Sequence, residues 1–109
     1  LAPLRDLGTA VGDAVYGMLN FFNRHDSAKY GSQGAPLHDP CTIAWLLAPD
    51  LFKAKQCNVS IEIQSALTLG HTAVDFWHVT EKPRNVRWIY DVNADEFFQL
   101  LSESLAQLR

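Results

Sequence analysis

The chain has 109 residues, of which 48% are hydrophobic and 19% charged, and its formal net charge is −3. This composition is typical of one packed domain and excludes a disordered tail. The slight acidic excess excludes the basic footprint of a nucleic-acid-binding protein, and no run approaches the roughly 20 apolar residues of a membrane span. Cys41 and Cys57 lack a C-x-x-C spacing, so we expect reduced, buried thiols in a cytoplasmic protein.

The first predicted element is a long amphipathic helix that begins at Pro3, because proline suits the first turn of a helix. We expect this helix to end near Asn23 and Arg24. Apolar residues recur along it at alternating spacings of three and four, which is the period of one helical face. These residues are Leu4, Leu7, Val11, Val15, Met18, Leu19 and Phe22.

A loop and a short helix are predicted next. Residues 25–37 contain glycine and proline, which predicts a loop of about a dozen residues, long enough to suggest a function. Asp39 precedes Pro40, the usual pairing of an N-cap with a first-turn proline, so we expect a helix over 40–48 that stops at Pro49. Because this helix is apolar nearly all round, we expect it to be buried.

Three strands and a terminal helix complete the chain. Alternating apolar and polar residues predict strands near 59–64, 72–80 and 86–90, with a loop over 65–71. Asn93, followed three residues later by Glu96, predicts a capping box that opens the last helix. The element order is therefore α-α-β-β-β-α. This order predicts an α/β fold in which three short strands form a small antiparallel layer beside the helices.

His38 and Asp39 are the strongest candidates for a chemical role, because they are adjacent at the predicted start of the second helix. A histidine can move protons near neutral pH, and a carboxylate can hold a hard cation through oxygen. Both residues also have a purely structural explanation. A histidine can fill space at a helix start, and an aspartate before proline is a good N-cap.

The run Pro36–Cys41 (Pro-Leu-His-Asp-Pro-Cys), with Pro-Asp-Leu-Phe following at 49–52, resembles the C-terminal active-site segment of the nucleoside hydrolases. These are the inosine/uridine-preferring N-ribohydrolases, and the resemblance is closest to the pyrimidine-specific branch. It extends over residues 1–109 and implies a single C-terminal fragment of an open-sheet hydrolase domain, with the Asp-rich N-terminal part missing. The family hydrolyses ribonucleosides to ribose and free base.

The resemblance also implies roles for three residues. Asp39 would be one ligand of a Ca²⁺ ion, His38 would help to protonate the departing base, and Tyr30 would contact that base. The family's general base and its other calcium ligands belong to the missing aspartate motif. We therefore expect a homo-oligomeric parent enzyme that acts on ribonucleosides, and an isolated chain that is inactive or nearly so.

Two other interpretations stay open at this stage. His25–Asp26 and His38–Asp39 could form a doubled metal site, as in metal-dependent phosphohydrolases, although those folds place their ligands on several long helices. Alternatively, the chain is a small α/β interaction or oligomerisation module without catalysis. His25–Asp26 also stands where the pyrimidine branch has a glutamine, which leaves the preferred base open.

Overall fold

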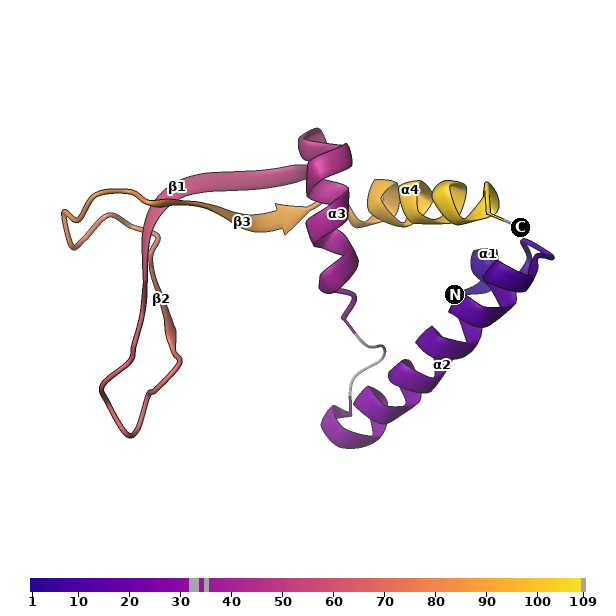
Figure 1. Cartoon of the computed structure of the whole chain (residues 1–109), viewed down its shortest axis with the longest axis horizontal. Coiled ribbons are helices and arrows are strands. Elements are labelled where there is room, and N and C mark those ends of the chain that lie inside the picture. The colour runs from indigo at the N-terminus through magenta and orange to yellow at the C-terminus, as the bar shows by residue number, and fades with distance from the viewer. Residues whose placement is uncertain (32–33, 35, 109) are drawn as a thin grey trace. The chain divides into compact units, whose positions relative to one another are not determined.

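The computed structural model describes residues 1–31, 34 and 36–108. The contacts divide the chain into a helical unit (Leu1–Leu51 and Asn93–Arg109) and a strand unit (Phe52–Val92). The helical unit contains α1 (Ala2–Arg5), α2 (Ala10–Tyr30), α3 (Asp39–Leu47), the 3₁₀ turn η1 (Pro49–Leu51) and α4 (Ala94–Ala106) (Figure 1). The strand unit contains β1 (Phe52–Ile61), β2 (Thr72–Asp75) and β3 (Val86–Val92). The predicted mixture of helices and antiparallel strands is confirmed.

The predicted first helix is two helices. After α1 the chain turns through Gly8, whose φ of +65° lies in the left-handed region that favours glycine. Thr9 then caps α2, because its hydroxyl oxygen accepts a hydrogen bond of 3.0 Å from the backbone N–H of Gly12. The apolar spacing therefore stays regular across the break between α1 and α2, which Gly8 and Thr9 create.

The C-terminal end of α2 also differs from the prediction. The helix does not end near Asn23 but runs on to Tyr30, where Gly31 takes a left-handed conformation with φ +66°. The Gly31 N–H donates to the Ser27 carbonyl at 2.9 Å and so satisfies one of the last free acceptors of the helix. Residues 25–30 of the predicted loop are therefore helical, and residues 32, 33 and 35 lie outside the described residues.

The core of the helical unit is small. Leu4 of α1, Ala44 of α3 and Phe97 of α4 are each about 5% exposed or less, and α1, α2 and α3 all contact α4. Gly12 is buried where α2 meets the preceding turn, and a Cβ there would lie 2.8 Å from the Leu4 carbonyl oxygen. Close backbone contact at Gly12 thus lets α1 pack against α2.

The expected burial of α3 is wrong for most of its surface. Of its nine residues Ala44 is buried, whereas Ile43, Leu46 and Leu47 are 58%, 75% and 67% exposed. An apolar helix is buried only where a neighbour covers it, and α4 covers one side of α3. Among the described residues, no helix has the combined length and hydropathy that crossing a bilayer requires.

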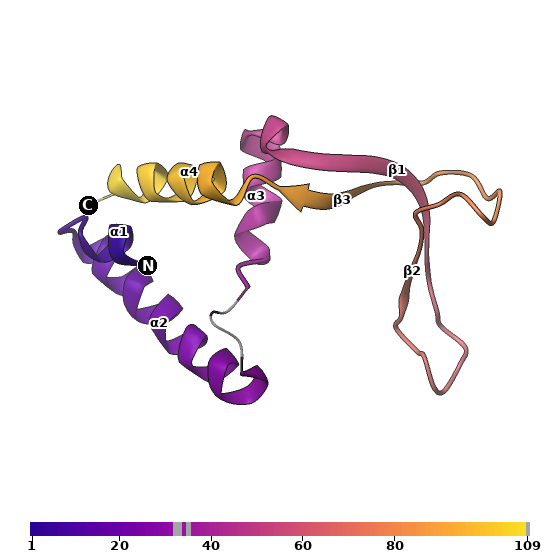
Figure 2. The same cartoon turned by 180° about the vertical axis from the view of Figure 1, so that it is seen from behind.

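The strand unit is an antiparallel sheet in the order β2-β1-β3 (Figure 2). The long strand β1 pairs with β3 through its first half, Phe52–Cys57, and with β2 through its second half, Asn58–Ile61. The predicted strand over 72–80 ends at Asp75, because the Asp75 carboxylate accepts hydrogen bonds from the N–H groups of Val79 and Thr80 and turns the chain. Both cysteines are free thiols. Cys57 is fully buried as expected, whereas the expected burial of Cys41 is wrong, because it is half-buried in the first turn of α3.

Candidate functional site

His38 and Asp39 begin α3, but not in the way that the sequence predicted. His38 is the N-cap residue, with φ −78° and ψ −49°, and its side chain makes no capping hydrogen bond. Because His38 already has a helical conformation, Asp39 is the first residue inside the helix and its carboxylate does not cap. Both residues are exposed, and within the described part of the chain neither side chain has a hydrogen-bond or ion-pair partner. The two functional groups are therefore available to an external ligand.

The backbone of this pair is held by Cys41 and Thr42, which follow Pro40. The Cys41 N–H donates to the His38 carbonyl at 3.0 Å, and the Cys41 thiol donates to the Leu37 carbonyl at 3.3 Å. The Thr42 hydroxyl donates to the Asp39 carbonyl at 2.7 Å. The first turn of α3 thus fixes the peptides that carry both functional side chains.

A cleft of about 250 Å³ adjoins the pair, and it is lined by Phe22, Pro36, Leu37, His38, Asp39 and Pro40. Sequence reasoning placed Phe22 on the apolar face of the first helix and not in the site. Once α2 is known to continue to Tyr30, Phe22 lies about two turns before the end of the helix, opposite the returning chain. An aromatic ring there, 44% exposed, gives the cleft an apolar wall.

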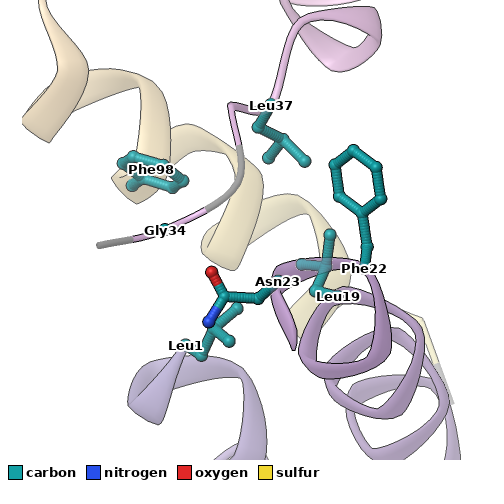
Figure 3. Close-up of a pocket in the computed structure, with 7 residues that line it drawn as sticks. All are labelled: Leu1, Leu19, Phe22, Asn23, Gly34, Leu37 and Phe98. Atoms are coloured by element: carbon teal, nitrogen blue, oxygen red, sulfur yellow. The ribbon is translucent and has the colours of Figure 1, made fainter. Parts of the chain in front are cut away.

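A second cavity of about 260 Å³ adjoins the first and shares Phe22 and Leu37 with it. Figure 3 shows the Leu37 side chain directed toward the side of the opening where Phe22 and Leu19 project from α2. The remaining lining residues of this cavity are Leu1, Asn23, Gly34 and Phe98. The His38–Asp39 pair therefore stands beside a mainly apolar hollow, the kind of surface against which a flat, weakly polar group packs.

Tyr30 is the last residue of α2 and is 67% exposed. The Lys29 ammonium lies 5.0 Å from the centre of its ring, within the range of a cation–π contact. Tyr30 is not among the described residues that line the cleft beside His38. Its contact with a base stays a prediction.

The described residues do not assemble a complete metal site. No group of three or more His, Cys, Asp or Glu side chains comes together among them, so the structure does not gather His25–Asp26 and His38–Asp39 into a doubled metal centre. Calcium takes six to eight oxygen ligands, and one exposed carboxylate supplies two at most. Asp39 can therefore be one ligand of a calcium ion but cannot form a complete calcium site.

A polar cleft of about 340 Å³ in the strand unit is a weaker candidate. It contains Asp75, His71 and Lys82, but the Asp75 carboxylate already accepts hydrogen bonds from the Thr80 hydroxyl at 2.6 Å and the Thr80 N–H at 2.9 Å. These bonds, with one from the Val79 N–H, lower the pKa of Asp75. The carboxylate therefore holds its own loop, and we assign it a structural role.

Comparison with known proteins identifies the family. The family model described as inosine-uridine preferring nucleoside hydrolase matches residues 1–99. The chain belongs to this family. The resemblance of the Pro36–Cys41 run is thereby confirmed, and so is the expected fold class.

Three relatives illustrate the extent of the match. The pyrimidine-specific ribonucleoside hydrolase RihA of Shewanella oneidensis is 49% identical over 104 residues, which are 94% of this chain and 33% of that protein. An uncharacterized protein of Schizosaccharomyces pombe, C1683.06c, is 42% identical over 99% of this chain and 35% of its own length. The solved purine-preferring ribonucleoside hydrolase from Gardnerella vaginalis superposes with a TM-score of 0.78 at 21% identity, covering 98% of this chain and 34% of that one.

These comparisons differ in what they support. At 21% identity the Gardnerella structure shows that the nucleoside hydrolase fold is shared, and nothing about substrate. The chain spans about a third of the length of the curated relatives that it matches. Activity, substrate and partners of the whole protein therefore belong to the proposal that follows.

Proposed function

We propose that this chain acts as the C-terminal third of a ribonucleoside hydrolase, an enzyme that uses water to cleave the bond between ribose and base. The observation that carries the proposal is the exposed, unpartnered His38–Asp39 pair beside a cleft with an aromatic wall. Membership of a nucleoside hydrolase family supports the reaction class. The active site would be completed by segments beyond these 109 residues, and the enzyme would be cytoplasmic and homo-oligomeric.

Asp39 would serve as one ligand of a calcium ion. Its carboxylate is exposed and is not used as a helix cap, so both oxygens can face a cation. The N-terminal end of α3 does not favour a cation, so the remaining oxygens would have to come from a set of further acidic side chains. When bound, calcium supplies charge that orients the ribose hydroxyls and the water.

His38 would act as the proton donor to the departing base. Cleavage of a glycosidic bond passes through an oxocarbenium-like state in which the leaving group gains electrons, and a proton delivered there lowers the barrier. Imidazole is the side chain that can hold and release a proton near neutral pH. The His38 ring is exposed at the cleft and is tied up by no hydrogen bond among the described residues.

Phe22 and Tyr30 would contact the base. Phe22 lines the cleft beside His38, and an aromatic face is a sequence-tolerant partner for a planar base. Tyr30 lies about two turns further along α2 and has an exposed ring. Relatives named as pyrimidine-specific at 46–49% identity support a pyrimidine ribonucleoside as the substrate.

The direct test measures ribose released from uridine, cytidine and inosine by the full-length protein with added Ca²⁺. We expect turnover of the pyrimidine nucleosides and a loss of about 100-fold or more in His38→Ala, the size of a general-acid contribution. His71→Ala is the matched control, because His71 is also an exposed histidine but lies in the strand unit and does not line the cleft. Equal losses in the two variants, or no turnover of any nucleoside, would refute the proposal.

The isolated 109-residue chain should not hydrolyse these nucleosides at a useful rate, because it offers one carboxylate where calcium needs several. The second candidate function is an interaction module without catalysis. It is favoured by one observation, the exposed apolar residues Ile43, Leu46 and Leu47 on α3. Robust turnover by the isolated chain would contradict our account of the site. The oligomeric state of the isolated chain in solution tests the interaction module.

A further inference from the structure

Three consecutive carbonyls, those of Leu37, His38 and Asp39, are each held by one of two adjacent residues. The Cys41 thiol donates a hydrogen bond to the Leu37 carbonyl at 3.3 Å, and the Cys41 N–H donates to the His38 carbonyl at 3.0 Å. The Thr42 hydroxyl donates to the Asp39 carbonyl at 2.7 Å. Such back-bonds from side chains to the carbonyls of the preceding turn compete with, or extend, the regular helical ladder. Here they act on the peptides that carry the two functional side chains.

The geometry at Cys41 has a specific consequence. Cys41 is the third residue of α3, so its N–H is one of the first four that a helix leaves without a partner four residues back. This N–H donates to the carbonyl of the N-cap residue His38, and the thiol donates to the carbonyl of Leu37, which precedes the helix. The Leu37 carbonyl and the His38 nitrogen belong to the same peptide group. The orientation of this peptide therefore sets the backbone from which the His38 imidazole projects.

We propose that Cys41 and Thr42 are positioning residues of the site, which hold His38 and Asp39 through these three carbonyls. The proposal rests on the function proposed above for His38 and Asp39. Cys41 acts on His38 and on the Leu37 wall of the cleft, and Thr42 acts on Asp39. Neither residue touches the reacting atoms.

The burial of the two cysteines supports a polar role for Cys41. Cys57 is fully buried, as a packing cysteine is, whereas Cys41 is half-buried and its thiol has a hydrogen-bond acceptor. A serine at 41 would keep a donor, and an alanine would remove it with little loss of packing. Thr42 is exposed, so Thr42→Val removes the hydroxyl and keeps the shape.

The kinetic test uses the full-length protein and measures kcat, KM for uridine and the pH profile of kcat. For Cys41→Ala we expect kcat to fall about tenfold with KM changed less than about twofold, because misplacing a catalytic group by a fraction of an ångström carries a penalty of this order. The pH profile should shift, and Cys41→Ser should recover most of the loss. Thr42→Val should lower Ca²⁺ affinity more than Cys41→Ala does.

Ser104→Ala is the matched control. The Ser104 hydroxyl makes the same kind of back-bond, to the Leu100 carbonyl at 2.7 Å, but it does so in α4. We expect this variant to keep the wild-type kcat and pH profile. A Cys41→Ala enzyme that matches wild type, or a Cys41→Ser enzyme as impaired as Cys41→Ala, would overturn the proposal.

A readout that does not depend on activity separates this proposal from the proposed function. The NMR signals of the His38 backbone amide and ring should move in Cys41→Ala, return in Cys41→Ser and stay in place in Ser104→Ala. If the protein hydrolyses no nucleoside but these signals move as expected, the proposed function fails and the positioning contact stands. If the His38 signals do not respond to Cys41, the positioning role is refuted even in an active enzyme.

Discussion

The backbone N–H of Asn93 donates a hydrogen bond of 2.8 Å to the carbonyl of Leu51. These two residues flank the strand unit, and the first ladder pair beyond them joins Phe52 to Val92. The chain therefore leaves the helical unit and re-enters it at one place. The Asn93 side chain has a second task, since its amide oxygen accepts from the Glu96 N–H at 3.2 Å and caps α4.

Asn93→Ala should lower the free energy of unfolding by about 1 kcal/mol, the usual contribution of an N-cap side chain. Asn93→Asp should preserve stability, because a carboxylate caps equally well and suits the positive end of the helix. Urea unfolding followed by circular dichroism measures both. Equal stability of the alanine and asparagine proteins would show that the cap contributes nothing.

Gly12→Ala and Gly17→Ala should have opposite effects although both glycines lie in α2. A Cβ at Gly12 would lie 2.8 Å from the Leu4 carbonyl oxygen, a backbone atom that cannot move cheaply, whereas a Cβ at Gly17 meets nothing within 4 Å. We expect Gly12→Ala to cost about 1–3 kcal/mol from overpacking. We expect Gly17→Ala to stabilise by up to about 1 kcal/mol from helix propensity. Thermal melting of the two variants against wild type decides, and effects of the same sign would contradict the packing of α1 on α2.

Acid should loosen the turn that follows β2. The Thr80 hydroxyl and the N–H groups of Thr80 and Val79 bind the ionised Asp75 carboxylate and lower its pKa below the unfolded value of about 3.9. A lowered pKa contributes stability that is complete above the unfolded pKa and is lost as the pH falls through the folded pKa. The amide NMR signals of Val79 and Thr80 should therefore hold to about pH 4 and change below it. In Asp75→Asn that acid-dependent step should be absent; a step of the same size would assign it to another group.

Local rules predicted the elements whose causes are local. The cap at Asn93 and the presence of three strands followed from residue spacing, although β1 begins at Phe52 and not near the predicted start at 59. The His38–Asp39 pair was singled out from its chemistry and from the family resemblance. The reciprocal half of the capping box was not formed, because the Asn93 N–H, which Glu96 would have bonded, is used by Leu51. That partner lies 42 positions away in sequence, which no local pattern reports.

The site was predicted less completely than the fold. Phe22 was missed because its place in the cleft depends on where α2 ends, and α2 ends at Gly31 and not near Asn23. Asp39 was assigned as an N-cap from its neighbour Pro40, but the helical conformation of His38 moved the cap one residue back. Both errors concern the path of the chain from the end of α2 to the start of α3, which the spacing of apolar residues does not predict.

The isolated chain should self-associate through α3 and α2. Ile43, Leu46 and Leu47 on α3 and Met18 and Phe21 on α2 are more than half exposed, and leaving such surface in water costs about 25 cal/mol per Å². Light scattering at micromolar concentration should report an oligomer. Leu46→Ser combined with Leu47→Ser should reduce its size, whereas Leu67→Ser should not, although Leu67 of the strand unit is 92% exposed. A monodisperse monomer with a cooperative thermal transition would contradict this prediction.

The most direct test of the central claim is a calorimetric Ca²⁺ titration of the full-length protein, paired with uridine turnover, in Asp39→Ala and His38→Ala. Our account predicts that Asp39→Ala loses metal affinity and turnover together, because a ligand is removed. It predicts that His38→Ala loses turnover and keeps Ca²⁺ affinity within about twofold, because imidazole is not a ligand that calcium prefers. Unchanged Ca²⁺ affinity in Asp39→Ala would contradict the ligand assignment and leave Asp39 a residue of the helix start alone.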